Sequence, residues 1–388
     1  MTETITSATP RCPHFGTCGG CQYQDLAYAE QLRIKRAHLV DLLQQAAVAA
    51  PPDISLHSAE PYGYRNRIRL RIERVDGVLR FGYNLRTTTD FFPITTCPIA
   101  APILIQTAES LLATAALNRD VGYWLNTTAE AELFCNDDLT RVQLTLFCTP
   151  RTKSPPRSQP GNFTNAFAAL QALAPQITGA AAVAFDPRTG PTGRTLAEAG
   201  AAGLNYRSPK PDETYWITRG AFFQVNRFLL DTLVQLVTKE RTGTLAWDLY
   251  AGVGLFSRVL SRSFTRVTAV EANPIAAADL RSALAKISPA STTVESTTLA
   301  FLRRALLDRD RPDLIVLDPP RAGAGLEVCD LLSSIAAPDL VYVSCDPTTL
   351  ARDLAILQPL YRITALHLVD LFPQTIHLET IAILERRS

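Results

Sequence analysis

The sequence predicts an α/β protein whose C-terminal part is a doubly wound, Rossmann-like parallel sheet. From residue 219 onward, short apolar runs alternate with amphipathic helical segments, as in a parallel sheet with helices on both faces. A cysteine- and glycine-rich segment lies near the N-terminus, and mixed strand and helix patterns lie between the two. We therefore expect a cysteine loop with a helix (1–50), a central α+β domain (51–218) and a C-terminal α/β domain (219–388).

The composition excludes several classes of protein. The chain has 388 residues, of which 47% are hydrophobic and 19% are charged, as in ordinary soluble globular proteins. No apolar run approaches membrane-spanning length, and the first eleven residues contain no signal-like apolar segment. We expect a cytoplasmic monomer without membrane association. Its formal net charge is only +1, so any surface that binds nucleic acid must be local.

Three of the eight cysteines, Cys12, Cys18 and Cys21, lie within ten residues of one another on a glycine-rich segment. In a cytoplasmic protein this grouping is more typical of a metal site than of disulfides or of three unconnected thiols. The thiols suit an iron–sulfur cluster or zinc, and the spacing does not distinguish the two. Both need a fourth ligand, for which Cys97 is the best remaining candidate.

A strand with alternating arginines is predicted over residues 64–72. Arg65, Arg67, Arg69 and Arg71 would share one face, with apolar side chains on the other. The stripe is either an electrostatic footprint for phosphates or the solvated outer face of a sheet, and the pattern supports both about equally.

The first strand of the C-terminal domain is predicted at 244–250, before a turn in which Gly252 and Gly254 permit close approach of a cofactor. The second strand ends in Glu271, a carboxylate that can accept both hydroxyls of a ribose. A nicotinamide dehydrogenase has a similar fingerprint, but its third glycine is missing here. Asp248 would also repel a pyrophosphate, so the pattern favours a sulfonium cofactor.

Chemically active side chains also follow the later strands of this domain. Asp318 begins an Asp-Pro-Pro-Arg segment at the sheet edge where such folds bind ligands. Cys345 lies between a strand and a helix predicted at 348–360, and helix-start amides raise the thiolate fraction of a thiol placed there. Glu379 abuts the final strand. The alternatives are a buried hydrophobic role for Cys345 and a surface position for Glu379.

These motifs together resemble the RNA (uracil-5-)-methyltransferase family, and most closely its iron–sulfur 23S ribosomal RNA enzymes. The resemblance spans most of the chain, and its motifs follow the family's order: CPHFGTCGGC (12–21), TTCPI (95–99), AFFQVN (221–226), DLYAGVGLF (248–256), VEAN (270–273), LDPPR (317–321), VSCDPTTLARDL (343–354) and LFPQTIHLET (371–380).

The resemblance implies a C-terminal domain that uses S-adenosylmethionine and an N-terminal [4Fe-4S] cluster. It implies Cys345 as the nucleophile that attacks carbon 6 of uracil and Glu379 as the base that removes the proton from carbon 5. The implied cluster ligands are Cys12, Cys18, Cys21 and Cys97. The implied contacts of S-adenosylmethionine are Gln224, Tyr250, Glu271 and Asp318.

One departure from the family concerns RNA binding. Many relatives with this cluster carry a small β-barrel RNA-binding domain before the cysteines, whereas only eleven residues precede Cys12 here. We therefore expect the central domain to bind the RNA, which the resemblance implies to be 23S rRNA, with the target uridine looped out or extruded. The rival functions are methylation of a transfer RNA uridine, methylation of an amino group, and a non-catalytic RNA-binding or assembly role.

Overall fold

The computed structural model describes residues 6–49, 53–149, 161–186, 188–210 and 212–388. The chain forms two compact units, and each contains two separate stretches or more of the sequence. The first unit comprises the described parts of Met1–Ser7, Leu26–Glu60 and Arg207–Ser388, and the second comprises Ala8–Asp25 with the described parts of Pro61–Tyr206. The cysteine loop thus belongs to the second unit and the helix that follows it to the first, whereas the sequence predicted that one segment, 1–50, would contain both.

In the part of the chain that the structure describes, eight strands form the sheet of the first unit, in the order β1-β16-β17-β15-β14-β11-β12-β13. Their bounds are β1 (Ile54–His57), β11 (Gly243–Leu249), β12 (Phe264–Glu271), β13 (Thr292–Glu295), β14 (Leu314–Leu317), β15 (Asp339–Ser344), β16 (Tyr361–Val369) and β17 (Glu379–Arg386). The strands from β13 to β15 pair in parallel, whereas β17 runs antiparallel to both β15 and β16. Because β17 is reversed, its first residue lies at the edge where the parallel strands end.

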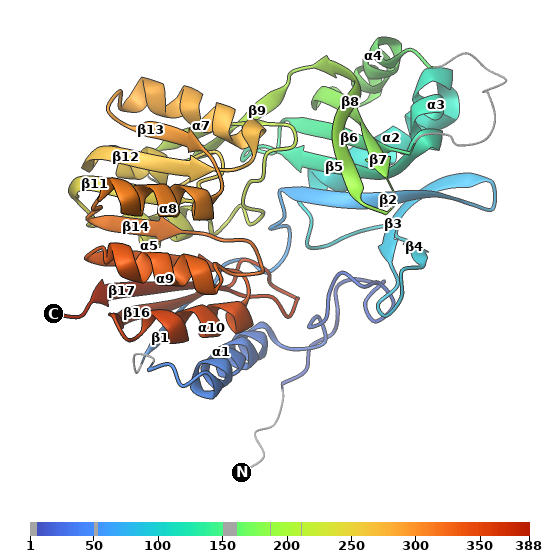
Figure 1. Ribbon diagram of the computed structural model, residues 1–388. Coiled ribbons are helices and arrows are strands. Elements are labelled where there is room, and N and C mark those ends of the chain that lie inside the picture. Colours follow the sequence, from blue (N-terminus) through green and yellow to red (C-terminus); the bar gives the residue numbers. More distant parts are fainter. Residues whose placement is uncertain (1–5, 50–52, 150–160, 187, 211) are drawn as a thin grey trace. The chain divides into compact units, whose positions relative to one another are not determined.

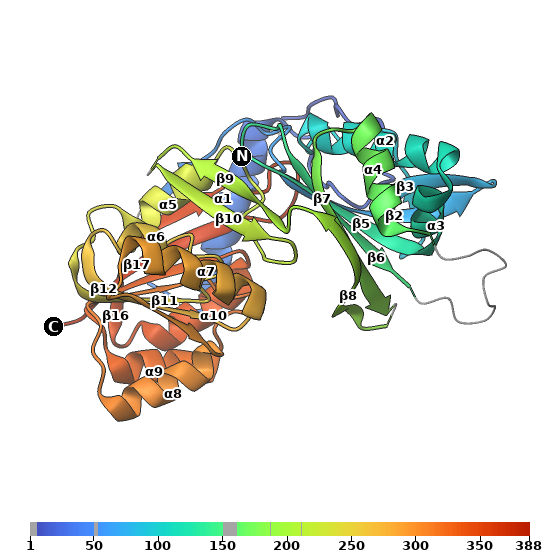
Figure 2. The same cartoon turned by 90° about the horizontal axis from the view of Figure 1, so that it is seen from above.

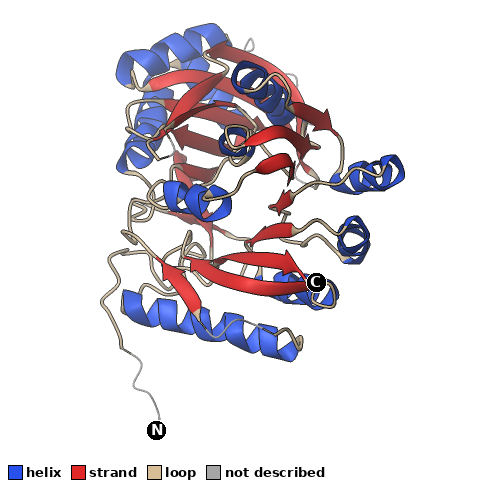
Figure 3. Ribbon diagram, turned by 90° about the vertical axis from the view of Figure 1, so that its left-hand side faces the viewer, coloured by secondary structure: helices blue, strands red, loops and turns tan. Residues whose placement is uncertain are grey.

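Helices lie on both faces of this sheet (Figures 1 and 3). They are α1 (Tyr28–Gln45), α5 (Leu230–Thr238), α6 (Ser257–Leu260), α7 (Pro274–Ile287), α8 (Thr298–Asp308), α9 (Leu326–Ile335) and α10 (Pro347–Leu357). Helices α1, α8, α9 and α10 share one apolar core with the sheet. Leu280 and Leu284 of α7 form a cluster with Ala269 of β12, whereas the next residue, Val270, belongs to the larger core. Successive strand residues thus serve opposite faces, which confirms the predicted α/β class.

The second unit contains a seven-stranded sheet, among the described residues, with the order β4-β3-β2-β5-β6-β7-β8. Helices α2, α3 and α4 cover one face of it and close a second apolar core (Figure 2). The bounds are β2 (Arg67–Val75), β3 (Val78–Asn84), β4 (Phe91–Pro93), α2 (Pro102–Leu117), α3 (Arg119–Thr127), β5 (Thr128–Cys135), β6 (Val142–Cys148), α4 (Phe163–Leu173), β7 (Ile177–Asp186) and β8 (Gly190–Gly200). Strands β9 (Gly203–Ser208) and β10 (Glu213–Thr218) form a separate two-stranded sheet.

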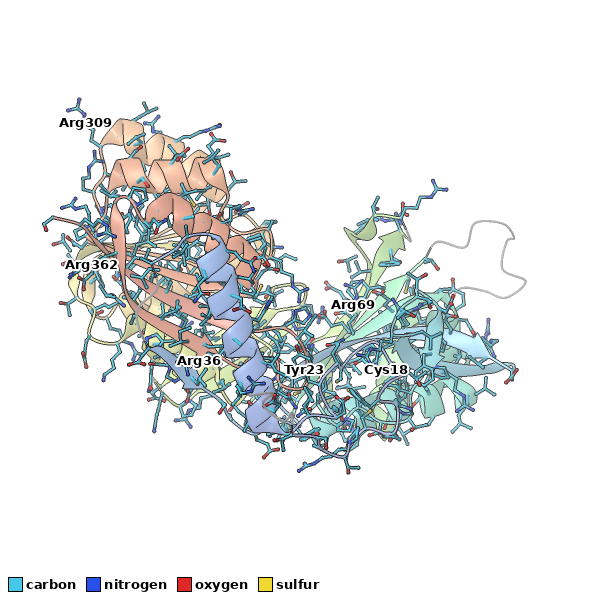
Figure 4. The ribbon with its side chains drawn as sticks, turned by 90° about the horizontal axis from the view of Figure 1, so that it is seen from below. Cys18, Tyr23, Arg36, Arg69, Arg309 and Arg362 are labelled. Atoms are coloured by element: carbon cyan, nitrogen blue, oxygen red, sulfur yellow. The ribbon has the colours of Figure 1, made fainter. Side chains whose placement is uncertain are left out.

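Three of the four arginines of the predicted stripe lie on β2, on the face opposite the apolar core, but carboxylates neutralise them. Arg67 lies 3.8 Å from Glu132, and Arg69 and Arg71 form ion pairs with glutamates of β5 and β2. The guanidinium of Arg69 also stacks 4.0 Å from the ring centroid of Phe147 (Figure 4 labels Arg69). The structure therefore favours an internally paired sheet face over a free phosphate footprint.

The predicted strand at 64–72 begins later than expected, at Arg67. Arg65 precedes it in an isolated bridge to Ala100 and lines a cavity that also contains the clustered cysteines. Among helices of the described residues, none combines the length and apolar character that a membrane crossing requires.

Candidate functional site

Four of the predicted site residues lie together at one edge of the sheet of the first unit, three of them at or next to strand ends and one in a loop. Asp318 follows the end of β14, and Cys345 follows the end of the neighbouring parallel strand β15. Ser344 pairs with Thr380 in the antiparallel β15–β17 ladder, so the next pair outward is Cys345 with Glu379. Gln224 donates a hydrogen bond of 3.3 Å to Oδ2 of Asp318. Residues from four motifs thus converge.

Burial sets the electrostatics of this edge. Glu379 is 2% exposed, and its Oε1 accepts no hydrogen bond from any described residue. Burial raises the pKa of Glu379 well above its ordinary value; the nearby Asp318 raises it further, and Arg321 opposes the shift. Burial likewise raises the pKa of Asp318 to about 7, with a smaller contribution from Asp248. The edge therefore holds several carboxyl groups that water does not stabilise in their charged forms.

The expectation that helix-start amides favour the Cys345 thiolate is wrong for the protein by itself. Burial raises the pKa of the Cys345 thiol to about 11, Glu379 and Asp318 raise it as well, and Arg321 lowers it. The amides of Thr348 and Thr349 at the start of α10 donate to the side chain of Asp346, the N-cap residue. Because the cap accepts these amides, they do not stabilise a negative sulfur.

The glycine turn is tied to the end of the second strand through Glu271. Oε2 of Glu271 accepts from the amide of Gly252 at 2.8 Å, and Oε1 accepts from the amide of Asn273 at 2.6 Å. Tyr250 and Gly252 adopt φ of 62° and 56°, a left-handed backbone that turns the chain sharply after β11. The phenol of Tyr250 hydrogen-bonds to Thr298. A carboxylate has about four acceptor positions, so Glu271 keeps capacity for a ribose.

Asp248, which was not among the predicted contact residues, is fully buried beneath this turn. Its Oδ2 accepts from the amide of Ser257 at 2.9 Å and from the Ser257 hydroxyl, whereas Oδ1 has no partner among the described residues. Burial raises the pKa of Asp248 to about 7, and the Ser257 hydrogen bonds oppose the shift. An orphaned buried carboxylate oxygen fits a site for a positively charged ligand.

Sequence reasoning also missed the residues that hold the Asp-Pro-Pro-Arg segment in place. Asp353 on α10 is fully buried and accepts from the hydroxyl of Tyr342 at 2.7 Å and from the amide of Ala324 at 2.8 Å. These contacts fix the segment that follows Arg321. Arg321 could be recognised from the sequence because it completes the Asp-Pro-Pro-Arg segment. Asp353 could not, because a single aspartate within a helix is usually an exposed polar residue.

In the second unit, all four predicted cysteines line one cavity of about 230 Å³. The loop that carries the first three is anchored to the end of β3, where the amide of Gly19 donates to the carbonyl of Asn84 at 3.0 Å (Figure 4 labels Cys18). A Cβ at Gly19 would lie 3.1 Å from the carbonyl oxygen of Leu85, so glycine permits this close approach. The fold thus brings Cys97 to the loop from a distant part of the sequence.

The cavity combines thiols with the guanidinium groups of Arg65 and Arg69. Burial raises the pKa of Cys97 to about 12, Cys21 adds to the shift, and Arg65 opposes it. Within the described residues, no three His, Cys, Asp or Glu side chains approach closely enough to hold a single metal ion. A four-iron cluster places iron and sulfide between its thiols and therefore needs them farther apart. Four cysteines around one cavity are a donor set that fits such a cluster.

Comparison with known proteins assigns the chain to a family. Residues 211–387 match the model of the tRNA (uracil-5-)-methyltransferase family. An uncharacterized RNA methyltransferase of Thermotoga maritima is 30% identical over 397 residues, which cover 98% of this chain and 85% of that protein. The 23S rRNA (uracil(1939)-C(5))-methyltransferase RlmD of Halomonas elongata is 30% identical over 403 residues, covering 99% and 78%. The chain belongs to the RNA (uracil-5-)-methyltransferase family.

Family membership confirms the predicted resemblance and identifies the protein as an RNA methyltransferase. The solved structure of Pyrococcus abyssi tRNA (uracil-54, C5)-methyltransferase in complex with S-adenosyl-L-homocysteine matches with a TM-score of 0.70 and 23% identity. The match covers 95% of this chain and 86% of that one. The two proteins therefore share their fold over nearly the whole of this chain.

Proposed function

We propose that this protein transfers a methyl group from S-adenosylmethionine to carbon 5 of a uridine in RNA. In this proposal Cys345 is the nucleophile and Glu379 is the base. The observation that carries it is the β15–β17 register, in which Ser344 pairs with Thr380 and the next positions outward are Cys345 and Glu379. A thiol and a buried carboxyl group at one sheet edge are the two groups that the reaction requires.

The ligand that fits the glycine turn is S-adenosylmethionine, which when bound supplies a methyl group on a cationic sulfur. Glu271 would accept the ribose hydroxyls, and Gln224, Tyr250 and Asp318 would form the rest of the site. Two features support a cation here: the unpartnered Oδ1 of Asp248 and the raised pKa of Asp318, about 7, which a nearby positive charge would lower again.

The residues then act in order on the uracil ring. The Cys345 thiolate adds to carbon 6, and the electron pair of the 5,6 double bond moves toward carbon 5. Carbon 5 would then take the methyl group as its bond to the sulfonium sulfur breaks, with neutral S-adenosylhomocysteine as the leaving group. The ionised Glu379 removes the proton from carbon 5, the double bond re-forms, and the thiolate leaves carbon 6. Arg321 is the cation that lowers the pKa of both Cys345 and Glu379.

We further propose 23S rRNA as the substrate, because the Halomonas elongata relative bears that name. The family model is described by tRNA, so a transfer RNA uridine is the second candidate. In either RNA the target base must leave its stack to reach Cys345 and Glu379, and the second unit would bind the surrounding strand. The four cysteines of that unit would hold a [4Fe-4S] cluster, for which their shared cavity is the support.

Mapping of 5-methyluridine tests this function. Ribosomal and transfer RNA from cells with and without the protein would be digested and analysed by mass spectrometry. We expect one 23S rRNA uridine to lose its methyl group when the protein is absent. Loss confined to transfer RNA would select the second candidate, and loss of an amino-group methylation would refute carbon-5 chemistry.

A further inference from the structure

We propose that α1 positions the catalytic base, and that the buried Lys35 is the positioning residue, acting through Asp370. The inference rests on the proposed function, in which Glu379 is the base. Helix α1 lies far from Glu379 in the sequence, but both belong to the first unit. The segment between Asp370 and Glu379 connects β16 to β17, so whatever fixes this segment fixes the start of β17.

One face of α1 is polar and buried. Tyr28, Gln31 and Lys35 are three and four residues apart and therefore share a face of the helix. Nζ of Lys35 lies 2.6 Å from Oδ1 of Asp370, and the two side chains are 1% and 0% exposed. The hydroxyl of Tyr28 donates to the other carboxylate oxygen of Asp370 at 2.9 Å. Both oxygens of this buried carboxylate are thus satisfied by α1.

The same face of α1 holds the segment that follows Asp370. Lys35 donates a second hydrogen bond, of 3.0 Å, to the carbonyl of Phe372. The side chain of Gln31 makes two bonds of 3.0 Å to Gln374, one from its amide nitrogen and one to its oxygen. Gln374 has a φ of 69°, which is unfavourable for a residue other than glycine and needs such outside support. The conformation of the segment therefore depends on α1.

Glu379 depends on its backbone for its position. Val369, the residue before Asp370, pairs with Glu379 in the β16–β17 ladder. Oε1 of Glu379 is buried and accepts no hydrogen bond from the described residues, so that oxygen is not held by a partner. If Asp370 shifted, the start of β17 would shift with it. The carboxyl group of Glu379 would then lie farther from the proton on carbon 5 that it must remove. Misplacement by about 1 Å can slow a reaction by about 10²-fold.

A buried ion pair is a costly way to stabilise a fold, because well-packed apolar residues of similar size often stabilise as well or better. The advantage of the ion pair is geometric. Lys35 contacts both Asp370 and the carbonyl of Phe372, and these two contacts together favour one conformation of the segment that leads to Glu379. This difference separates a positioning role from a purely structural one. Removing both charges with Lys35→Met and Asp370→Leu would restore stability without restoring the position of Glu379.

The test compares Lys35→Met with Arg36→Met, which changes the adjacent, exposed arginine of the same helix (Figure 4). We expect turnover of Lys35→Met to fall by about 10²-fold while Arg36→Met keeps the wild-type rate.

The second readout is the amount of covalent adduct between the protein and RNA. In 5-fluorouridine, fluorine stands in place of the proton that Glu379 would remove from carbon 5. Fluorine cannot leave as a cation, so an RNA with 5-fluorouridine at the target stays bound to Cys345 whether or not Glu379 is correctly placed. Lys35→Met should form this adduct as the wild type does, and should also accumulate adduct with ordinary RNA.

Equal turnover in Lys35→Met and Arg36→Met would overturn the inference. So would a parallel loss of turnover and fluorouridine adduct in Lys35→Met, which marks a structural defect. The double variant Lys35→Met/Asp370→Leu should regain the melting temperature but stay slow, and a recovery of turnover would show that the ion pair only stabilises the fold. If the wild type forms no fluorouridine adduct, the proposed function fails and the inference fails with it.

Discussion

The carboxyl group of Glu379 contributes to the raised pKa of the Cys345 thiol, so two residues from different motifs belong to one electrostatic unit. Asp318 raises the pKa of both, and Arg321 lowers it. In the protein alone, the thiol therefore favours its protonated form at neutral pH, and the pKa of the buried Glu379 is raised in the same direction. A bound cation at this edge would favour their ionised forms, which links the arrival of a sulfonium ligand to activation of the nucleophile and the base.

Replacement of the nucleophile should separate chemistry from binding. We expect Cys345→Ala to lower methyl transfer by on the order of 10⁴-fold or more, because no other group can add to carbon 6. The affinity for S-adenosylhomocysteine should stay close to that of the wild type. Transfer of radiolabelled methyl to RNA measures the first quantity, and calorimetry the second. Cys329→Ala, at a buried cysteine of α9, is the matched control. Full activity of Cys345→Ala would disprove the assignment.

Replacement of the base should trap an intermediate. Glu379→Gln removes the group that accepts the proton from carbon 5, so we expect turnover to fall by about 10²–10⁴-fold. The covalent bond between Cys345 and carbon 6 then cannot break by the normal route, and a protein–RNA adduct should accumulate. Denaturing gel electrophoresis detects it as a band of lower mobility that RNase removes. Absence of that band in a folded Glu379→Gln protein would mean that another group is the base.

Binding of the methyl donor should depend on pH through Asp318. Its pKa is raised to about 7, so the carboxyl group is largely neutral at pH 6 and largely ionised at pH 8. A cationic sulfonium needs the ionised form, whereas the neutral thioether of S-adenosylhomocysteine does not. We expect the affinity for S-adenosylmethionine relative to S-adenosylhomocysteine to rise by about 10-fold from pH 6 to pH 8.

The ratio of the two affinities cancels the titration of groups that both ligands share. Asp318→Asn should make this ratio independent of pH, whereas Asp330→Asn, at an exposed position of α9, should leave the wild-type profile unchanged. Calorimetry at three pH values provides the measurement. A wild-type ratio that stays flat would show that Asp318 does not face the sulfonium.

The cysteine cavity should bind iron and sulfide. We expect about four irons and four labile sulfides per chain in protein purified without oxygen. Cys97→Ser should lower both contents together with the visible absorption, because it removes one of the four thiols around the cavity. Cys148→Ser, at a buried cysteine of β6 outside the cavity, should not. One zinc per chain without sulfide would refute the cluster.

The sequence predicted the fold class and the strand-end positions of the candidate site residues better than the environments of those residues. Local patterns are enough to place Asp318, Cys345 and Glu379 at strand ends, because apolar runs and turn residues mark those ends. The same patterns gave the wrong environment for Cys345, since the acceptor of the helix-start amides is Asp346 and two distant carboxyl groups face the thiol. They also placed Arg65 on a strand face, whereas it lines the cysteine cavity.

By itself, the sequence determined the α/β class, the family motifs and the grouping of Cys12, Cys18 and Cys21, because these follow from local periodicity and residue spacing. Only the tertiary structure decided that β17 runs antiparallel and brings Glu379 beside Cys345, that glutamates pair with the arginine stripe, and that α1 holds the segment leading to Glu379. Such features depend on contacts between residues far apart in the chain, which short-range patterns do not encode.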